Sequence, residues 1–204
     1  MQLDFGRVRV VLSFSFVAVI TLMLLLCREE IVLISLFSSL FHEGGHLLFI
    51  LLFSDAPESV VFGAFGIRIE REYVEHLSYK KEALIALGGI IGNFILALLS
   101  LLFYFFSKNR ICFEFFTVNI FVALFNLMPI RQLDAGRVAE CIFGILTDVS
   151  TVERIMRLLT VITLLVISIC CILYNIYLGL NISLIAVTVY LILISTLKEF
   201  NNDK

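Results

Sequence analysis

The sequence predicts an all-α polytopic membrane protein with six transmembrane helices and one short β-hairpin. The chain is 61% hydrophobic with a mean hydropathy of +1.07, which is well above the apolar content of a soluble domain. Several apolar runs approach the roughly 20 residues that a helix needs to cross a bilayer. The basic residues are concentrated in alternate loops, as is typical of proteins that cross the membrane several times.

Six apolar runs are candidates for these helices: residues 10–26, 31–53, 82–106, 111–129, 157–174 and 178–197. The first run follows Arg7 and Arg9, as in a signal peptide, but it ends without a small-residue cleavage site, so we expect a retained helix. Of the 15 basic residues, only Arg28, Lys108 and Arg110 lie in loops on the second side of the membrane. The positive-inside bias therefore predicts that both termini face the cytoplasm.

Two cytoplasmic loops are the main soluble segments. Residues 60–70 alternate apolar and charged residues after two glycines, which predicts a β-hairpin in the loop after the second span. This hairpin either closes the loop or offers an edge strand to an extended substrate. In the second loop, apolar residues on one face predict an interfacial helix after Pro129. Ser150 and Glu153 predict a capping box at the start of the fifth span.

The segment His42-Glu43-Gly44-Gly45-His46 is an HExxH motif inside the second apolar run. Positions four apart share one face of a helix, so both imidazoles can reach one metal ion, with Glu43 beside its open side. Ionisable groups at membrane depth cost roughly 3 kcal/mol each on insertion scales, and they usually line a cavity or have a partner. A metal ion is the natural partner for this pair. The two glycines favour close approach of another backbone or of substrate.

A third protein ligand is needed, because zinc usually has three protein ligands and a water. Asp134 is the candidate. Pro129 ends or bends the fourth span, which allows the following backbone to fold back toward a protein-lined cavity. Together, Asp134 and Glu43 would balance the charge of a divalent ion. The second and fourth spans both run toward the cytoplasm, so their ligands can converge on that side.

These motifs resemble those of the site-2 proteases, which are intramembrane zinc metalloproteases. That family combines HExxH with a distal Asn-x-x-Pro-x-x-x-x-Asp-Gly segment, and this sequence matches the segment at Asn126, Pro129 and Asp134. Ala135 stands where the family usually has the first of two glycines. The family's Gly-Pro-x-x-Asn element appears here as residues 89–93, with Ile90 in place of proline. The resemblance covers residues 31–137.

The resemblance implies a zinc metalloendopeptidase with one Zn²⁺ per chain. The ligands would be His42, His46 and Asp134, and Glu43 would be the general base for a zinc-activated water. Asn93 and Asn126 are candidates for binding the substrate backbone or the oxyanion, although polar side chains in membranes also bond one helix to another.

Within the family, the chain is most similar to the stage IV sporulation FB-type branch, because of its small size, its span number and a motif near position 42. That branch implies a membrane-associated sigma-factor precursor as substrate. We expect one membrane domain over residues 1–204, without a PDZ or CBS module. The expected partners are a membrane protein substrate, the lipid bilayer and regulatory membrane proteins. The net charge of −2 does not point to a nucleic acid.

Two other functions use the same residues. A membrane metal transporter would employ them as a transit site, but it needs polar residues toward both faces, and the outer halves of these spans are almost wholly apolar. A catalytically silent relative would bind membrane proteins without cleaving them. Such relatives usually carry a broken motif, whereas this one is complete.

Overall fold

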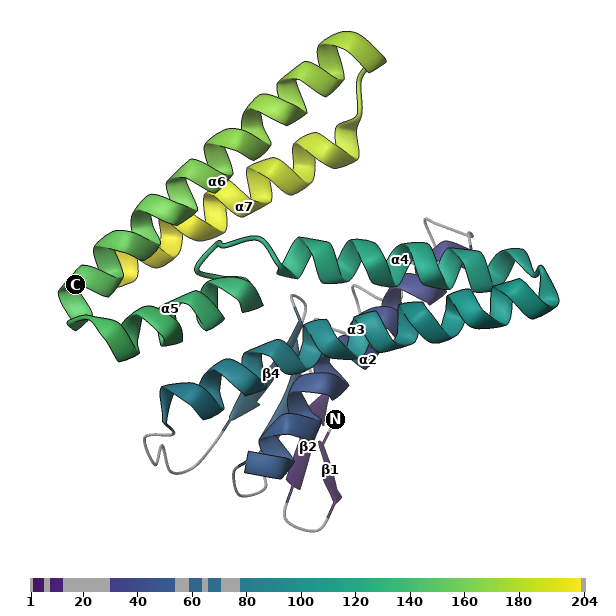
Figure 1. The fold of residues 1–204 in the computed structure, drawn as a ribbon, viewed down its shortest axis with the longest axis horizontal. Coiled ribbons are helices and arrows are strands. Elements are labelled where there is room, and N and C mark those ends of the chain that lie inside the picture. The colour runs from purple at the N-terminus through teal and green to yellow at the C-terminus, as the bar shows by residue number, and fades with distance from the viewer. Residues whose placement is uncertain are drawn as a thin grey trace. The chain divides into compact units, whose positions relative to one another are not determined.

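The computed structural model describes the backbone of residues 2–5, 8–12, 30–53, 59–63, 66–70 and 78–202, and the side chains of residues 30–53 and 78–196. The chain forms two compact units, residues 1–125 and 126–204. The first holds four strands and three described helices, and the second holds three helices (Figure 1).

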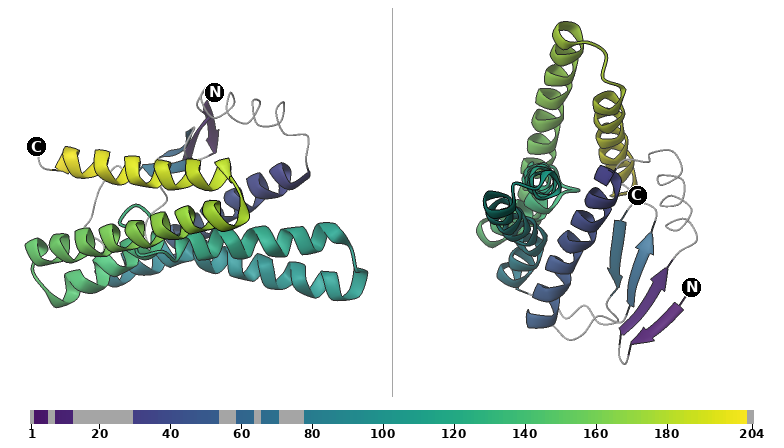
Figure 2. Two further views of the ribbon diagram at one scale, coloured as in Figure 1. Left: turned by 90° about the horizontal axis from the view of Figure 1, so that it is seen from above. Right: turned by 90° about the vertical axis from the view of Figure 1, so that its right-hand side faces the viewer.

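A four-stranded sheet opens the first unit, with the order β1-β2-β3-β4. Strand β1 (Gln2–Phe5) pairs antiparallel with β2 (Val8–Leu12), and β2 pairs parallel with β3 (Ser59–Gly63) (Figure 2). A parallel pair needs a crossover connection, and α2 (Glu30–Phe53) lies within it. Residues 10–12, predicted to begin the first span, belong instead to β2. Their β-branched valines favour a strand that has neighbours on both sides. Residues 13–26 of that predicted span lie outside the described residues.

Strand β4 (Gly66–Glu70) pairs antiparallel with β3, with Val61 opposite Arg68. This ladder occupies the segment for which the sequence predicts a hairpin. The pairing of β3 with the N-terminal strands was not predicted, because it joins segments about 50 residues apart through backbone hydrogen bonds that leave no local sequence pattern.

Three helices in the described part of the chain are long and apolar enough to cross a membrane: α2, α3 (Tyr79–Ser107) and α6 (Val149–Leu178). The expectation of six spans is therefore not supported. Helix α4 (Arg110–Asn126) has 17 residues, a length of about 26 Å, which is short of the roughly 30 Å hydrocarbon core. In α7 (Ile182–Asn202), the apolar stretch is Ile182–Thr196.

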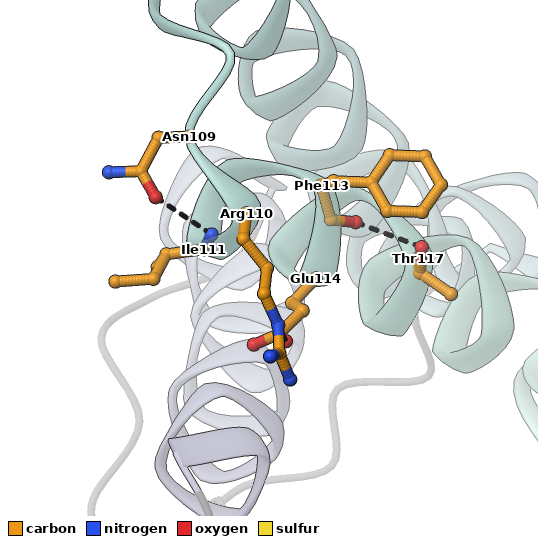
Figure 3. A network of polar contacts seen from close by, with 6 residues as sticks. All are labelled: Asn109, Arg110, Ile111, Phe113, Glu114 and Thr117. Atoms are coloured by element: carbon orange, nitrogen blue, oxygen red, sulfur yellow. Dashed lines mark hydrogen bonds and ion pairs between the residues drawn. The ribbon is translucent and has the colours of Figure 1, made fainter.

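The start of α4 is defined by local polar contacts (Figure 3). The side-chain oxygen of Asn109 accepts a hydrogen bond of 2.9 Å from the backbone N–H of Ile111, which caps the first turn. Arg110 and Glu114, four residues apart, form an ion pair of 2.6 Å. Thr117 donates to the Phe113 carbonyl one turn earlier, at 2.8 Å. These bonds satisfy polar groups at the end of an otherwise apolar helix.

Helices α2 and α3 cross at glycines. An added Cβ at Gly45 would overlap the carbonyl group of Gly88, and one at Gly88 would lie 2.7 Å from the Gly45 oxygen. Small residues allow helix backbones to approach closely in membranes. The close neighbour expected for Gly45 is therefore the backbone of α3, whereas Gly44 has open space beside it.

The burial pattern of α2 is inverted relative to a soluble helix. Its buried stripe, with one residue every four, is Ile34, Ser38, His42, His46 and Ile50. Meanwhile, Leu48 and Leu52 are 55% and 66% exposed. Polar residues inside and leucines outside fit a helix surrounded by lipid.

In the second unit, α6 and α7 run antiparallel side by side (Figures 1 and 2), and α5 (Asp134–Leu146) precedes them. The segment between Asn126 and α5 is anchored to both long helices. Ile130 is fully buried, the backbone N–H of Arg131 donates to Thr160 Oγ1 at 3.2 Å, and Ser195 Oγ donates to Gln132 Oε1 at 3.2 Å.

The N-cap of α6 is Asp148, whose side chain accepts from the backbone N–H of Thr151. The capping box predicted from Ser150 and Glu153 is therefore wrong. Ser150 already lies in the helix, and its hydroxyl donates to the Asp148 carboxylate. The sequence offers two polar residues two positions apart, and a local pattern cannot decide which one starts the helix.

Candidate metal centre

The two histidines of the HExxH motif lie on the buried face of α2. His42 is 7% exposed and His46 is 9% exposed. Their spacing of four residues places the two rings one helical turn apart. The ring planes are nearly perpendicular, at 88° to one another. As a result, the two Nε2 atoms face each other at 3.2 Å.

Hydrogen bonds at the opposite ring nitrogens define the tautomers. His46 Nδ1 lies 2.8 Å from the carbonyl oxygen of Ile85, which can only accept, so Nδ1 carries the hydrogen. His42 Nδ1 lies 2.5 Å from Oδ1 of Asn93. The Asn93 amide nitrogen is already directed at the carbonyl of Ser38, at 3.2 Å, and at Oδ1 of Asn119, at 2.7 Å. Its oxygen therefore faces His42, and His42 Nδ1 is also the donor.

Both Nε2 atoms consequently carry a lone pair, and they lie 3.2 Å apart. Two neutral imidazoles in this arrangement cannot hydrogen-bond to each other, and their lone pairs repel. A cation between them would turn that repulsion into attraction. Imidazole nitrogen is among the commonest zinc ligands, and a ligating histidine almost always donates its other ring N–H to a carbonyl or carboxylate. The donor set thus fits a metal ion.

The space beside the Nε2 atoms exists because residue 89 is glycine. An added Cβ there would lie 2.7 Å from His42 Nε2 and 2.6 Å from His42 Cε1, and it would overlap His46 Nε2. Any larger residue at position 89 would place its side chain against both Nε2 atoms, where a metal ion would bind. Residues 89–93, which resemble the family's Gly-Pro-x-x-Asn element, therefore contribute open space at Gly89 as well as the side chain of Asn93.

Glu43 follows His42 on α2 and is half-buried. One residue along a helix is a rotation of about 100°, so its carboxylate projects from the flank of the histidine face.

Asp134 belongs to the second unit, where it is the first residue of α5 and 8% exposed. A carboxylate is favoured at a helix N-terminus by the helix dipole. The helix can begin here because residue 136 is glycine: an added Cβ would overlap the carbonyl of Ile130 and lie 2.8 Å from the Arg131 Cα. Pro129 was expected to bend the chain before Asp134, and the structure confirms a turn of non-helical residues at 127–133.

His42 and His46 in the first unit and Asp134 in the second are each buried and each of a residue type that ligates zinc. A zinc ion held by two imidazoles and one carboxylate would keep a further position for water, as in catalytic zinc sites.

The two asparagines singled out from the sequence have different surroundings. All hydrogen-bonding groups of the Asn93 amide are engaged within the first unit, by His42, Ser38 and Asn119. These contacts favour a role in orienting His42 over the expected role in binding substrate. Asn126 is the last residue of α4 and is half-buried.

Sequence reasoning missed two contributors to this site. Ser38 lies one turn before His42 on the same buried stripe, and its spacing of four from His42 was a usable signal. The carbonyl of Ile85 left none, because a backbone acceptor is independent of the residue type that carries it.

Comparison of the sequence with protein-family models and with curated proteins finds no match. A solved structure, the site-2 protease from Methanocaldococcus jannaschii, has a similar fold, with a TM-score of 0.65. The similarity covers 94% of this chain and 91% of that one, at 17% sequence identity. The two chains therefore share a fold over nearly their whole lengths.

Proposed function

We propose that this protein is an intramembrane zinc metalloendopeptidase that cleaves a membrane-embedded or membrane-associated protein. The observation that carries the proposal is the histidine pair of α2. Its two Nε2 atoms lie 3.2 Å apart, and each ring is oriented by a hydrogen bond at Nδ1, which leaves Nε2 as the ligating atom. The fold shared with a site-2 protease and the apolar helices support the same function.

His42, His46 and Asp134 would hold the ion, and a bound zinc ion would supply Lewis acidity and a water of lowered pKa. Glu43 would take a proton from that water and later deliver it to the leaving nitrogen of the peptide. Asn93 would keep His42 in its ligating tautomer. Asn126, at the end of α4, is proposed to hydrogen-bond the substrate backbone.

The sheet suggests how a substrate segment is received. Strand β4 is an edge strand, and an extended peptide can pair with such an edge through its backbone. The substrate segment that pairs with β4 would be held in an extended conformation and presented for hydrolysis. A sporulation sigma-factor precursor is the first substrate to try, on the strength of the sequence resemblance alone. Cytoplasmic termini and an active site that opens to the cytoplasm complete the proposal.

Glu43→Gln tests the mechanism. The variant should fold and bind zinc as the wild type does, because Glu43 is not a proposed ligand. Cleavage of a co-expressed candidate membrane substrate should fall by roughly 10²- to 10⁴-fold, the usual contribution of a general base. Glu153→Gln, at an exposed position of α6, is the matched control and should cleave normally.

Retained cleavage by Glu43→Gln would remove this mechanism. Zinc flux through reconstituted vesicles that is insensitive to Glu43→Gln would favour the transporter, and zinc binding without cleavage of any substrate would favour the silent binding protein.

A further inference from the structure

Three polar side chains lie fully buried where α2, α3 and α4 meet. Ser38, Asn93 and Asn119 each have no exposed surface. Burying an amide or hydroxyl without a hydrogen bond is costly, so such groups are retained where each has partners. Here their bonds form one chain that ends on His42.

Asn119, on α4, is the far end of this chain. Its amide nitrogen donates to Ser38 Oγ at 2.9 Å and to the Phe115 carbonyl at 2.8 Å. With both hydrogens committed, its oxygen accepts from the Asn93 amide nitrogen at 2.7 Å. The carbonyl oxygen of Phe115 can only accept, which excludes the reversed orientation of the Asn119 amide.

The orientation passes from Asn119 to Asn93. If the Asn93 amide turned over, its oxygen would face two acceptors, the Ser38 carbonyl and Asn119 Oδ1, and its nitrogen would face His42 Nδ1. His42 would then accept at Nδ1 and carry its hydrogen on Nε2, the atom aimed at the metal position. A protonated Nε2 cannot ligate a metal.

We propose that Asn119 is a positioning residue that sets the tautomer of His42 through Asn93, and thereby sets the affinity of the centre for zinc. This inference rests on the proposed metal site. It goes beyond that site because Asn119 lies on α4, which supplies none of the proposed metal ligands. It also predicts an asymmetry. His46 donates to a backbone carbonyl, so its tautomer is independent of the chain of side chains.

Two substitutions separate orientation from packing. Asn119→Leu is similar in size but removes the oxygen that accepts from Asn93. Asn119→Asp keeps an acceptor oxygen in that place. Burial favours the neutral acid, whose O–H can donate to the Phe115 carbonyl while the Ser38 hydroxyl turns to donate to the same oxygen. Ser100→Ala is the matched control on α3, because the Ser100 hydroxyl is buried and donates to the Leu96 carbonyl of its own helix.

Two measurements on the full chain in detergent or nanodiscs test the inference. The first is the ¹⁵N shift of each histidine ring nitrogen in metal-free protein, which reports the tautomer. In Asn119→Leu, His42 should acquire hydrogen on Nε2, while His46 should be unchanged. The second is zinc affinity by competition with a chromophoric chelator. Asn119→Leu should bind zinc roughly 10- to 100-fold more weakly, while Asn119→Asp and Ser100→Ala should resemble wild type.

An Asn119→Leu protein with wild-type zinc affinity and Nδ1–H on His42 would overturn the inference. So would equal weakening by Asn119→Leu and Asn119→Asp, which would assign Asn119 a packing role only. If the leucine variant does not fold, Asn119→Ser, whose shorter side chain cannot reach Asn93, replaces it with the same expectations. Failure of the wild-type chain to bind zinc would overturn the proposed function, whereas the tautomer measurement decides the role of Asn119 separately.

Discussion

At the scale of single residues, the candidate metal centre depends on a position without a side chain as much as on its proposed ligands. Gly89 faces the two imidazoles of α2, and its missing side chain leaves the space that their lone pairs share. Gly92, one turn further along α3, has only ordinary neighbours, the nearest 3.5 Å from an added Cβ. Two glycines on one helix therefore have different roles.

Gly89→Ala should abolish zinc binding while α3 remains intact. Alanine favours a helix over glycine by about 1 kcal/mol, so any loss reflects the filled space and not a weakened helix. Zinc content after purification, measured by atomic emission beside the helical signal in circular dichroism, would check this. Gly92→Ala should retain zinc. Stoichiometric zinc in Gly89→Ala would show that the ion, if bound, lies elsewhere.

At the scale of elements, α6 is held at its start by a side chain that titrates. Asp148 accepts from the Ser150 hydroxyl, from the Thr151 hydroxyl at 2.7 Å and from the Thr151 backbone N–H at 3.2 Å. These bonds, chiefly those from the Ser150 and Thr151 side chains, lower the pKa of Asp148 from 3.8 to about 2. A lowered folded-state pKa means that the cap stabilises the folded state above pH 4 and loses this contribution as the pH falls toward 2.

The first turn of α6 should therefore fray in acid. Protection of the Thr151 and Val152 amides against hydrogen exchange, corrected for intrinsic rates, should fall between pH 4 and pH 2. Asp148→Asn provides the comparison, because asparagine caps helices well but does not titrate. Its protection should stay constant over the same range. A parallel fall in both proteins would assign the effect to other groups.

At the scale of the whole molecule, the proposed ligands come from two compact units. His42 and His46 belong to residues 1–125, and Asp134 belongs to residues 126–204. A ligand that binds only the folded chain stabilises it by an amount set by its concentration relative to Kd. A zinc ion shared between the units would therefore stabilise both against unfolding.

Removal of zinc by a chelator should lower the Tm, and re-addition at 100 times Kd should restore about 2.7 kcal/mol. In Asp134→Ala, zinc should give a much smaller increase, because one of three ligands is gone. Differential scanning fluorimetry in detergent, with Glu153→Gln as the control, would measure both. An equal zinc-dependent shift in Asp134→Ala and wild type would exclude Asp134 as a ligand.

Much of this protein can be predicted from its sequence where a property is local. The HExxH spacing predicts two histidines on one helical face, and α2 has that arrangement. Apolar runs predict long helices because length and hydropathy are read residue by residue, and α2, α3 and α6 have both properties. Local patterns also mislead when neighbours compete. Residues 10–12 belong to a strand where the start of a membrane span was expected, and Asp148 caps α6 in place of Ser150.

Only the tertiary structure decided which groups distant in sequence meet. The parallel pairing of β2 with β3, the crossing of α2 and α3 at Gly45 and Gly88, and the contact between His42 and Asn93 each join segments more than 40 residues apart. Residue type indicates what a side chain can donate or accept, but the tautomer of His42 depends on the orientation of the amide opposite. That orientation is a property of three packed helices, so no single segment of the sequence contains it.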